Sequence, residues 1–154
     1  MKRLYIILFC TLAVFITASA QSSDKLYKEA KALYDAKNYA AAVPKLKTAA
    51  EKGHKKAQYR LGRCYDKGHG VTENDALAFQ WYMKSAKQDY AKAQYQLGKC
   101  YVKGKGVEVD QKKASTWLKK AVKSEKNGKD ILDKIRKDAA DGDEDAKVML
   151  RLLK

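Results

Sequence analysis

Residues 57–71 read AQYRLGRCYDKGHGV and residues 93–107 read AQYQLGKCYVKGKGV, so one motif occurs twice, 36 residues apart. The alignment extends to residues 53–88 and 89–124 without a gap and keeps sixteen identical positions. A fixed period of about 20 to 50 residues is typical of stacked repeat proteins, in which each unit packs on its neighbours. The sequence therefore predicts an elongated array of similar units.

Each unit is predicted to contain two helices joined by a glycine turn. Ala57, Leu61 and Cys64 recur at the spacing of one helical face. A Gly-x-Gly turn follows, because glycine readily adopts the left-handed conformation in which many helices end. Asn74 and its counterpart Asp110 are suitable N-caps for the second helix. The apolar positions of that helix are Ala78, Trp81 and Ala86, repeated as Ala114, Trp117 and Val122.

The flanks of the two repeats continue the helical pattern. Residues 24–52 predict a further helix pair with a turn at Lys37-Asn38, and Pro44 is expected to bend its second helix or delay its start. Residues 125–154 predict closing helices, the last of which repeats the apolar spacing of residues 53–61. We therefore expect an all-α domain over residues 21–154, with about eight helices, no strands and units at 24–52, 53–88, 89–124 and 125–154.

The N-terminus predicts an export signal. Lys2 and Arg3 precede an uncharged apolar stretch, and Ala18 and Ala20 form an A-x-A cleavage pattern. The apolar stretch of about 13 residues is shorter than the roughly 20 residues that a membrane-spanning helix needs. We expect residues 1–20 to be a cleaved signal peptide, which leaves an exported chain, periplasmic or secreted, without a membrane span. The oligomeric state stays open.

The chain is strongly basic. It has 33 Lys and Arg residues against 18 Asp and Glu residues, a formal net charge of +15. Removing residues 1–20 takes away Lys2 and Arg3 and no acid, which leaves +13 on 134 residues. Such a charge raises the local concentration of anions and their rate of association, but it does not specify a fold.

The sequence contains no recognisable motif for catalysis or for binding a metal or cofactor. The Gly-x-Gly turns lack the spacing of a phosphate-binding loop. His54 and His69 have no Cys or His at metal-ligand spacing, so both are expected at the surface. The acidic run at residues 141–145 is expected at a helix N-terminus, because Ala146 and Leu152 stand where a calcium loop needs Gly and an acid. We expect no catalytic residue, no metal and no cofactor.

Each repeat carries one cysteine, Cys64 or Cys100, at equivalent positions. Packed helices lie roughly 8–10 Å apart, whereas a disulfide needs Cα atoms within about 7 Å. Both residues are therefore expected to be buried free thiols that pack as small hydrophobic side chains.

The pattern A-Q-Y-x-L-G-x-x-Y-x-x-G-x-G-V, followed by a capping Asn or Asp, Ala and Trp, resembles the Sel1-like repeat of the tetratricopeptide-like helical superfamily. The resemblance covers residues 53–124, while residues 24–52 are more similar to an ordinary tetratricopeptide unit. It implies a right-handed superhelix of stacked helix pairs. It also implies a non-enzymatic scaffold that holds other macromolecules in a curved groove.

The resemblance further implies where a partner binds, because the first helix of each unit lines the concave face in tetratricopeptide-like solenoids. The family's groove position falls on a tyrosine in three successive units, with a cation on the same helical face. A tyrosine offers an apolar face and a polar tip, and Lys or Arg can meet a carboxylate, so an acidic extended peptide fits. The alternative is that these tyrosines pack between repeats. The predicted groove residues are Tyr27, Lys31, Lys56, Tyr59, Arg63, Lys92, Tyr95 and Lys99.

Two functions remain open at this stage. The first is an exported scaffold that binds a protein or acidic peptide through a basic, tyrosine-lined groove. The second is a binder of anionic polymers, such as an acidic glycan, lipid head groups or nucleic acid, through its basic surface. A polymer binder should weaken steeply, whatever the sequence of the polymer, as salt concentration rises.

Overall fold

The computed structural model describes residues 22–154. The predicted signal peptide at residues 1–20 lies outside the described residues. The described part is all-α, without a strand, which confirms the predicted fold class. Its helices span residues 22–35, α2 Tyr39–Glu51, α3 Lys55–Lys67, α4 Asp75–Ala86, α5 Ala91–Lys103, α6 Gln111–Val122, α7 Gly128–Ala140 and α8 Glu144–Leu152.

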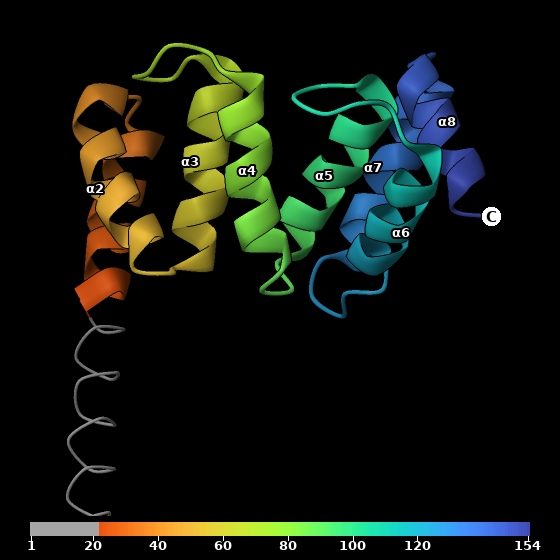
Figure 1. Ribbon diagram of the computed structural model, residues 1–154. Helices are drawn as coiled ribbons and strands as arrows, with labels where there is room; N and C mark the ends of the chain where they lie inside the picture. The colour runs from red at the N-terminus through yellow and green to blue at the C-terminus, as the bar shows by residue number, and fades with distance from the viewer. Residues whose placement is uncertain (1–21) are drawn as a thin grey trace, which may run out of the picture.

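The helices follow one another along an elongated array that begins beside α2 and ends at α8 (Figure 1). The helices from α2 to α6 pack on their neighbours along the chain, most extensively within the pairs α3–α4 and α5–α6, and α7 packs mainly on α8. Near the end the chain also folds back, where α8 contacts both α5 and α6. A chain in which each element packs on its sequence neighbours in this way is a helical solenoid.

The helix ends confirm the predicted turns and caps. α3 and α5 end at Gly68 and Gly104, which have φ of 65° and 69° in the left-handed region. The Asn74 side chain accepts a hydrogen bond from the Leu77 amide at 2.9 Å and so caps α4. Asp110 caps α6 in the same way, through the Lys113 amide at 2.8 Å. α2 begins at Tyr39, so Pro44 does not delay its start.

The second glycine of each turn lies against the preceding unit. A Cβ atom on Gly70 would lie 2.8 Å from the backbone of Tyr39, the first residue of α2. A Cβ atom on Gly106 would lie 2.2 Å from the carbonyl oxygen of Asp75, the first residue of α4. Only glycine leaves room for these approaches, so each turn rests on the start of the second helix of the unit before it.

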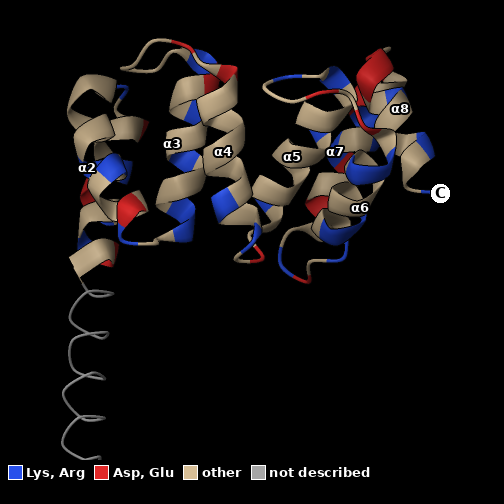
Figure 2. Cartoon of the chain, in the orientation of Figure 1, with Lys and Arg blue, Asp and Glu red and all other residues tan. Residues whose placement is uncertain are grey.

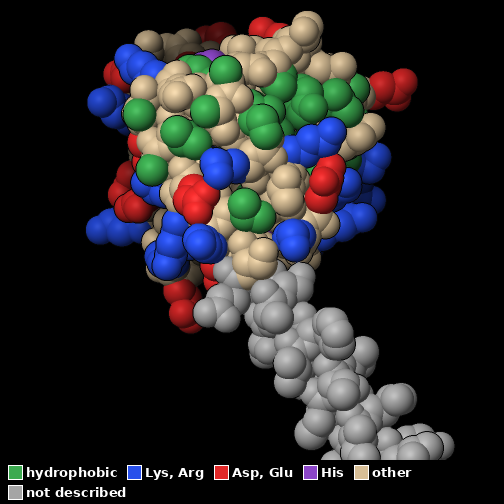
Figure 3. All heavy atoms as spheres, turned by 90° about the vertical axis from the view of Figure 1, so that its left-hand side faces the viewer, with side chains coloured by type: hydrophobic (Ala, Val, Ile, Leu, Met, Phe, Trp, Pro, Cys, Tyr) green, Lys and Arg blue, Asp and Glu red, His purple; other side chains and the backbone are tan. Residues whose placement is uncertain are grey.

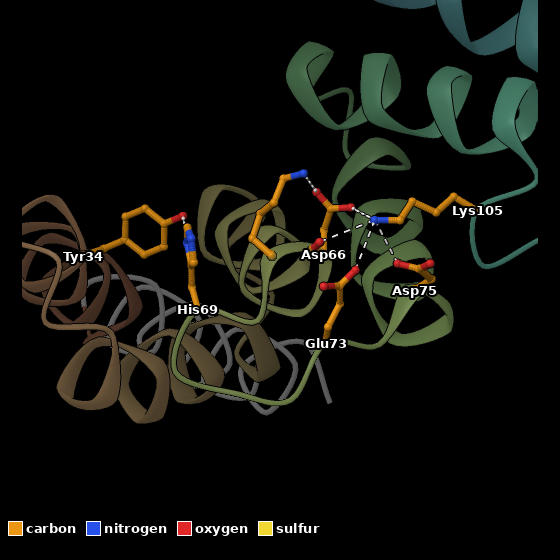
Figure 4. Close-up of polar contacts among 7 residues, drawn as sticks. Tyr34, Asp66, His69, Glu73, Asp75 and Lys105 are labelled. Carbon is orange, nitrogen blue, oxygen red and sulfur yellow. Dashed lines mark hydrogen bonds and ion pairs between the residues drawn. The ribbon is translucent and has the colours of Figure 1, made fainter. Parts of the chain in front are cut away.

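The residue between the two glycines also reaches back to the preceding unit (Figure 4). The His69 ring stacks on Tyr39 with ring centroids 4.2 Å apart, and its Nδ1 lies 3.1 Å from the Tyr34 hydroxyl. In the next repeat Lys105 takes this place, and its ammonium lies 2.7 Å from Asp66 and 3.0 Å from Asp75. The two turns thus connect units by different chemistry at one repeat position.

The expectation that His54 and His69 are surface residues is wrong, because both are partly buried between units. His54 caps α3 by accepting a hydrogen bond from the Ala57 amide, and its ring stacks on Tyr27 at 4.4 Å. Burial lowers the pKa of His54, although Asp24 at 3.0 Å opposes that change. The spacing along one helix could not show these contacts, since they come from the neighbouring unit.

Small residues let the helices of a unit approach closely. A Cβ atom on Gly62 of α3 would lie 2.7 Å from the Tyr82 ring of α4, and one on Gly98 of α5 would lie 2.6 Å from Leu118 of α6. Tyr82 and Leu118 are fully buried at these contacts. Cys64 and Cys100 are free and buried, as predicted.

Two features of the surface bear on function. Lys and Arg residues occur on every labelled helix (Figure 2). At the end where the array begins, hydrophobic side chains gather over part of the face formed by residues 22–35 and α2 (Figure 3). Within residues 22–154, no helix is both long enough and apolar enough to cross a membrane.

Candidate interaction groove

A hollow of about 400 Å³ opens between α3, α5 and α7. We call it the central hollow. α3 and α5 contribute five of the predicted groove residues, and α7 closes the opposite side. The lining residues are Tyr59, Arg63, Asp66, Lys67, Lys92, Tyr95, Gln96, Lys99, Asn127, Asp130, Ile131 and Lys134.

Cations outnumber acids around the central hollow, and three of them are not neutralised. Lys67 lies 3.5 Å from Asp66, and Lys134 lies 2.9 Å from Asp138. In contrast, Arg63, Lys92 and Lys99 form no ion pair with any residue from 22 to 154. The walls formed by α3 and α5 therefore present positive charge that an anionic ligand could neutralise.

Lys99 is the most constrained of these three cations. Its ammonium lies 5.7 Å from the centroid of the Tyr95 ring, on the same face of α5. Burial lowers the pKa of Lys99, and the nearby ammonium groups of Lys103 and Lys134 lower it further. Since a nearby negative charge would offset these effects on the ammonium, a bound carboxylate at this point is electrostatically favoured.

The two tyrosines of the hollow differ in exposure. Tyr59 is half-buried, and its ring packs edge-on against Tyr90 at 5.3 Å. Tyr95 is only 6% exposed, and burial raises its pKa to about 12. Its buried hydroxyl has no hydrogen-bond partner in the described structure. Tyr59 is therefore available to a ligand, whereas Tyr95 forms part of the wall.

A second hollow of about 250 Å³ adjoins the first and shares Asp66, Lys67, Gln96 and Lys99 with it. It extends the surface toward Lys103 and Lys105. Burial raises the pKa of Asp66, but the hydrogen bond and charge of Lys105 outweigh this, so the pKa is lowered overall. Asp66 is thus an ionised, paired carboxylate between the two hollows and does not cancel the free cations.

Three predicted groove residues lie apart from the central hollow. Tyr27 stacks on His54, and its hydroxyl accepts a hydrogen bond from Nε of Arg60 at 3.3 Å. Lys31 pairs with Asp35 on its own helix. Lys56 is exposed and is not among the lining residues. The structure thus brings together Tyr59, Arg63, Lys92, Tyr95 and Lys99, and the binding role of all eight residues stays a prediction.

Sequence reasoning missed the part of the hollow that does not repeat. Asp130, Ile131 and Lys134 come from α7, which has no counterpart in residues 53–124. Arg60 was missed as well, because its repeat partner is Gln96. Its guanidinium lies 3.4 Å from Asp35 and 5.0 Å from the centre of the Tyr34 ring, so it joins the first unit to α3. Within the described residues, no group of three or more His, Cys, Asp or Glu side chains could hold a metal ion.

Helix pairs that stack on one another in chain order are characteristic of helical repeat proteins, and this chain has that arrangement. The chain matches the Sel1 repeat family at residues 55–90 and 91–125, about two residues later than the units set from the sequence. These two segments are therefore Sel1 repeats, and together they span somewhat less than half of the chain. Such repeats generally form non-enzymatic scaffolds for protein–protein interaction.

Solved structures of Sel1 repeat proteins are similar to this chain. A Sel1 repeat protein from Oxalobacter formigenes is 37% identical over 75% of this chain, with a TM-score of 0.64. The protective antigen c5321 of uropathogenic Escherichia coli, which has the same fold, is 27% identical over 82% of this chain, with a TM-score of 0.65. This chain spans 47% of the first protein and 28% of the second. No curated protein matches the chain.

Proposed function

We propose that this protein is an exported scaffold that binds an extended acidic segment of a partner protein in the central hollow. Binding of proteins is the general role of Sel1 repeats. Export rests on the basic start, the apolar stretch and the A-x-A pattern of residues 1–20. The acidic character of the partner rests on the hollow itself.

The observation that carries the proposal is the set of unpaired cations Arg63, Lys92 and Lys99 around a single hollow. Arg63 and Lys99 are partly buried, whereas Lys92 is exposed. A partly buried cation without a partner is unfavourable, so a carboxylate beside Arg63 or Lys99 is more stabilising than one at an open surface. The half-buried Tyr59 beside them adds an apolar surface with a polar tip. This combination suits an acidic peptide better than a neutral one.

The form of the partner follows from the shape of the lining. The central hollow continues into its neighbour along α5, so the surface is longer than a pocket for one side chain. Gln96 lines both hollows, and its amide can donate to and accept from a peptide backbone. An extended segment of several residues can use this strip, with carboxylates beside the three cations.

A peptide that stays extended in solution tests the proposal. The fluorescein-labelled peptide (Glu-Pro)₅ is acidic and favours the extended polyproline conformation, and (Gln-Pro)₅ is its neutral counterpart. We expect fluorescence anisotropy to show binding of (Glu-Pro)₅ and at least tenfold weaker binding of (Gln-Pro)₅. The double variant Arg63→Glu/Lys92→Glu should weaken binding of (Glu-Pro)₅ at least tenfold.

A matched variant controls for net charge. Lys47→Glu/Lys87→Glu makes the same change of charge at two exposed residues outside the hollow that form no ion pair with any residue from 22 to 154. The affinity of this control variant for (Glu-Pro)₅ should stay within twofold of that of the unchanged protein. Equal loss of binding in both double variants would contradict the proposal, and melting curves of both establish that they are folded.

Binding of anionic polymers is the second candidate, and the spread of Lys and Arg over every labelled helix favours it (Figure 2). A polymer held by such a surface releases counterions, so its affinity falls steeply with salt. Heparin serves as the probe. If heparin binds more tightly than (Glu-Pro)₅ and both double variants weaken it equally, the polymer function is the better account.

A further inference from the structure

A separate groove of about 580 Å³ lies at the C-terminal end of the array, between α6, α7 and the end of α8. We call it the C-terminal groove. It shares no lining residue with the central hollow. Its lining contains only aliphatic and cationic side chains, which sets it apart from the central hollow, where tyrosine, amide and carboxylate groups mix with the cations.

The floor of the C-terminal groove is aliphatic. It consists of Val122 from α6, Leu132 from α7, and Leu150 and Leu153 from the α8 end. Val122, Leu150 and Leu153 pack on the buried core of this end and remain partly exposed on the groove side. Leu132 does not belong to that core cluster, so its side chain contributes to the groove rather than to the interior.

The rim of the C-terminal groove is cationic. It consists of Lys119, Lys123, Arg136 and Lys154. Arg136 lies 3.5 Å from Asp133, but both side chains are more than half exposed, so this pair is weak. The three lysines form no ion pair with any described residue, and no carboxylate side chain is part of the described lining. Four basic side chains therefore surround the apolar floor, and the weak Arg136–Asp133 pair is the single ion pair that they form within the described residues.

The lining restricts what can occupy the groove. It has no neutral side chain that could accept a hydrogen bond from an extended peptide backbone, and buried backbone groups need such partners. A helix satisfies its backbone hydrogen bonds internally, so it can place aliphatic side chains on this floor without leaving backbone groups unpaired. Acidic residues beside its apolar stripe would meet the cationic rim.

We propose that the C-terminal groove binds an amphipathic helix of a partner protein, with an aliphatic stripe flanked by Asp and Glu residues. The helix presents apolar side chains at positions i, i+3, i+4 and i+7, the spacing of a single helical face. With the extended acidic segment in the central hollow, the scaffold then has two independent binding surfaces of different chemistry.

A designed peptide serves as the probe. It is an 18-residue stapled helix, labelled with fluorescein, with Leu at i, i+3, i+4 and i+7, Glu on both flanks and Ala elsewhere. Its counterpart has Lys in place of each Glu. By fluorescence anisotropy we expect the Glu peptide to bind at least tenfold more tightly than the Lys peptide.

Variants locate the binding site. Lys119→Glu/Lys123→Glu and, separately, Leu132→Ser should each weaken binding of the Glu peptide at least tenfold. The control Lys129→Glu/Lys137→Glu makes the same change of charge at two exposed residues of α7 outside the groove and should stay within twofold. Circular dichroism melting checks that each variant is folded, so weaker binding in a folded variant is assigned to the groove.

The result separates this inference from the proposed function. Arg63→Glu/Lys92→Glu should leave binding of the Glu helix unchanged, and Lys119→Glu/Lys123→Glu should leave binding of (Glu-Pro)₅ unchanged. Unchanged binding of the helix in Lys119→Glu/Lys123→Glu would overturn the inference. So would binding of dodecanoate at this groove without binding of the helix, which would assign the site to an anionic amphiphile.

Discussion

Gly62 and Gly98 set the distance between the two helices of each Sel1 repeat. Each lies in the middle of a helix, where glycine costs about 1 kcal/mol relative to alanine through its greater conformational freedom. The Tyr82 ring and the Leu118 side chain occupy the space in which a Cβ atom would stand. The two glycines therefore serve close packing and not a turn, which their positions in the motif did not reveal.

The substitution Gly62→Ala tests this contact. Its Cβ atom would lie 2.7 Å from the Tyr82 ring, which is fully buried. We expect a net loss of about 1–3 kcal/mol of unfolding free energy, because overpacking outweighs the gain in helix propensity. Urea unfolding measures it. Equal or greater stability in the variant would mean that α3 and α4 do not approach this closely.

The cysteines give a second prediction for single residues. Burial raises the pKa of Cys64 to about 11 and that of Cys100 to about 12, so neither is a thiolate at pH 8. Since the thiolate is the reactive form, iodoacetamide should modify neither residue in the folded protein. After denaturation without a reducing agent, peptide mapping should find both modified. Two unmodified residues at that stage would reveal a disulfide and contradict the free thiols.

At the level of elements, the turn at residues 104–110 holds two units together through Lys105. Burial lowers the pKa of Lys105, but its hydrogen bond to Asp66 and its ion pair with Asp75 outweigh this and raise the pKa overall. Glu73 lies 3.6 Å from the same ammonium (Figure 4). One side chain thus bridges α3, the turn after it and the first residue of α4.

Replacing Lys105 by Met should lower the unfolding free energy at pH 7 by about 1–2 kcal/mol, because Asp66 loses its hydrogen-bonded cation and keeps only Lys67 at 3.5 Å. The folded pKa of Asp66 lies below its unfolded value of about 3.9. Its contribution is therefore complete above about pH 5 and is lost as the pH falls through the folded pKa. Urea unfolding at pH 7 and pH 3 should show the difference between the two proteins shrinking in acid. A constant difference would contradict this account.

The local features of the elements could be predicted from the sequence, whereas the contacts between units could not. Caps such as Asn74 and turns such as Gly68 depend on a few neighbouring residues, so a motif is sufficient to identify them. The contacts of His69 with Tyr39 and of Lys105 with Asp66 join residues more than 25 positions apart. These residues differ between the repeats, so no periodic signal marks them.

At the scale of the whole molecule, the candidate site also combines residues of the repeated motif with residues that do not repeat. The repeated positions Tyr59 and Tyr95, with the cations near them, were predicted, because the repeat places them on equivalent faces of α3 and α5. The contribution of α7 was not, since its sequence does not repeat. Tyr27 and Lys31 lie outside the central hollow because their contacts are with His54 and Asp35.

The central claim is that one hollow, and not the basic surface in general, recognises an acidic segment. Titration of ¹⁵N-labelled protein with (Glu-Pro)₅, followed by NMR amide chemical shifts, tests it most directly. We predict that the largest shifts lie at Arg63, Gln96, Lys99 and Lys134, which line the central hollow, and that residues of α2 shift little. Shifts of similar size spread over the Lys residues of α2, α4 and α6 would contradict the claim.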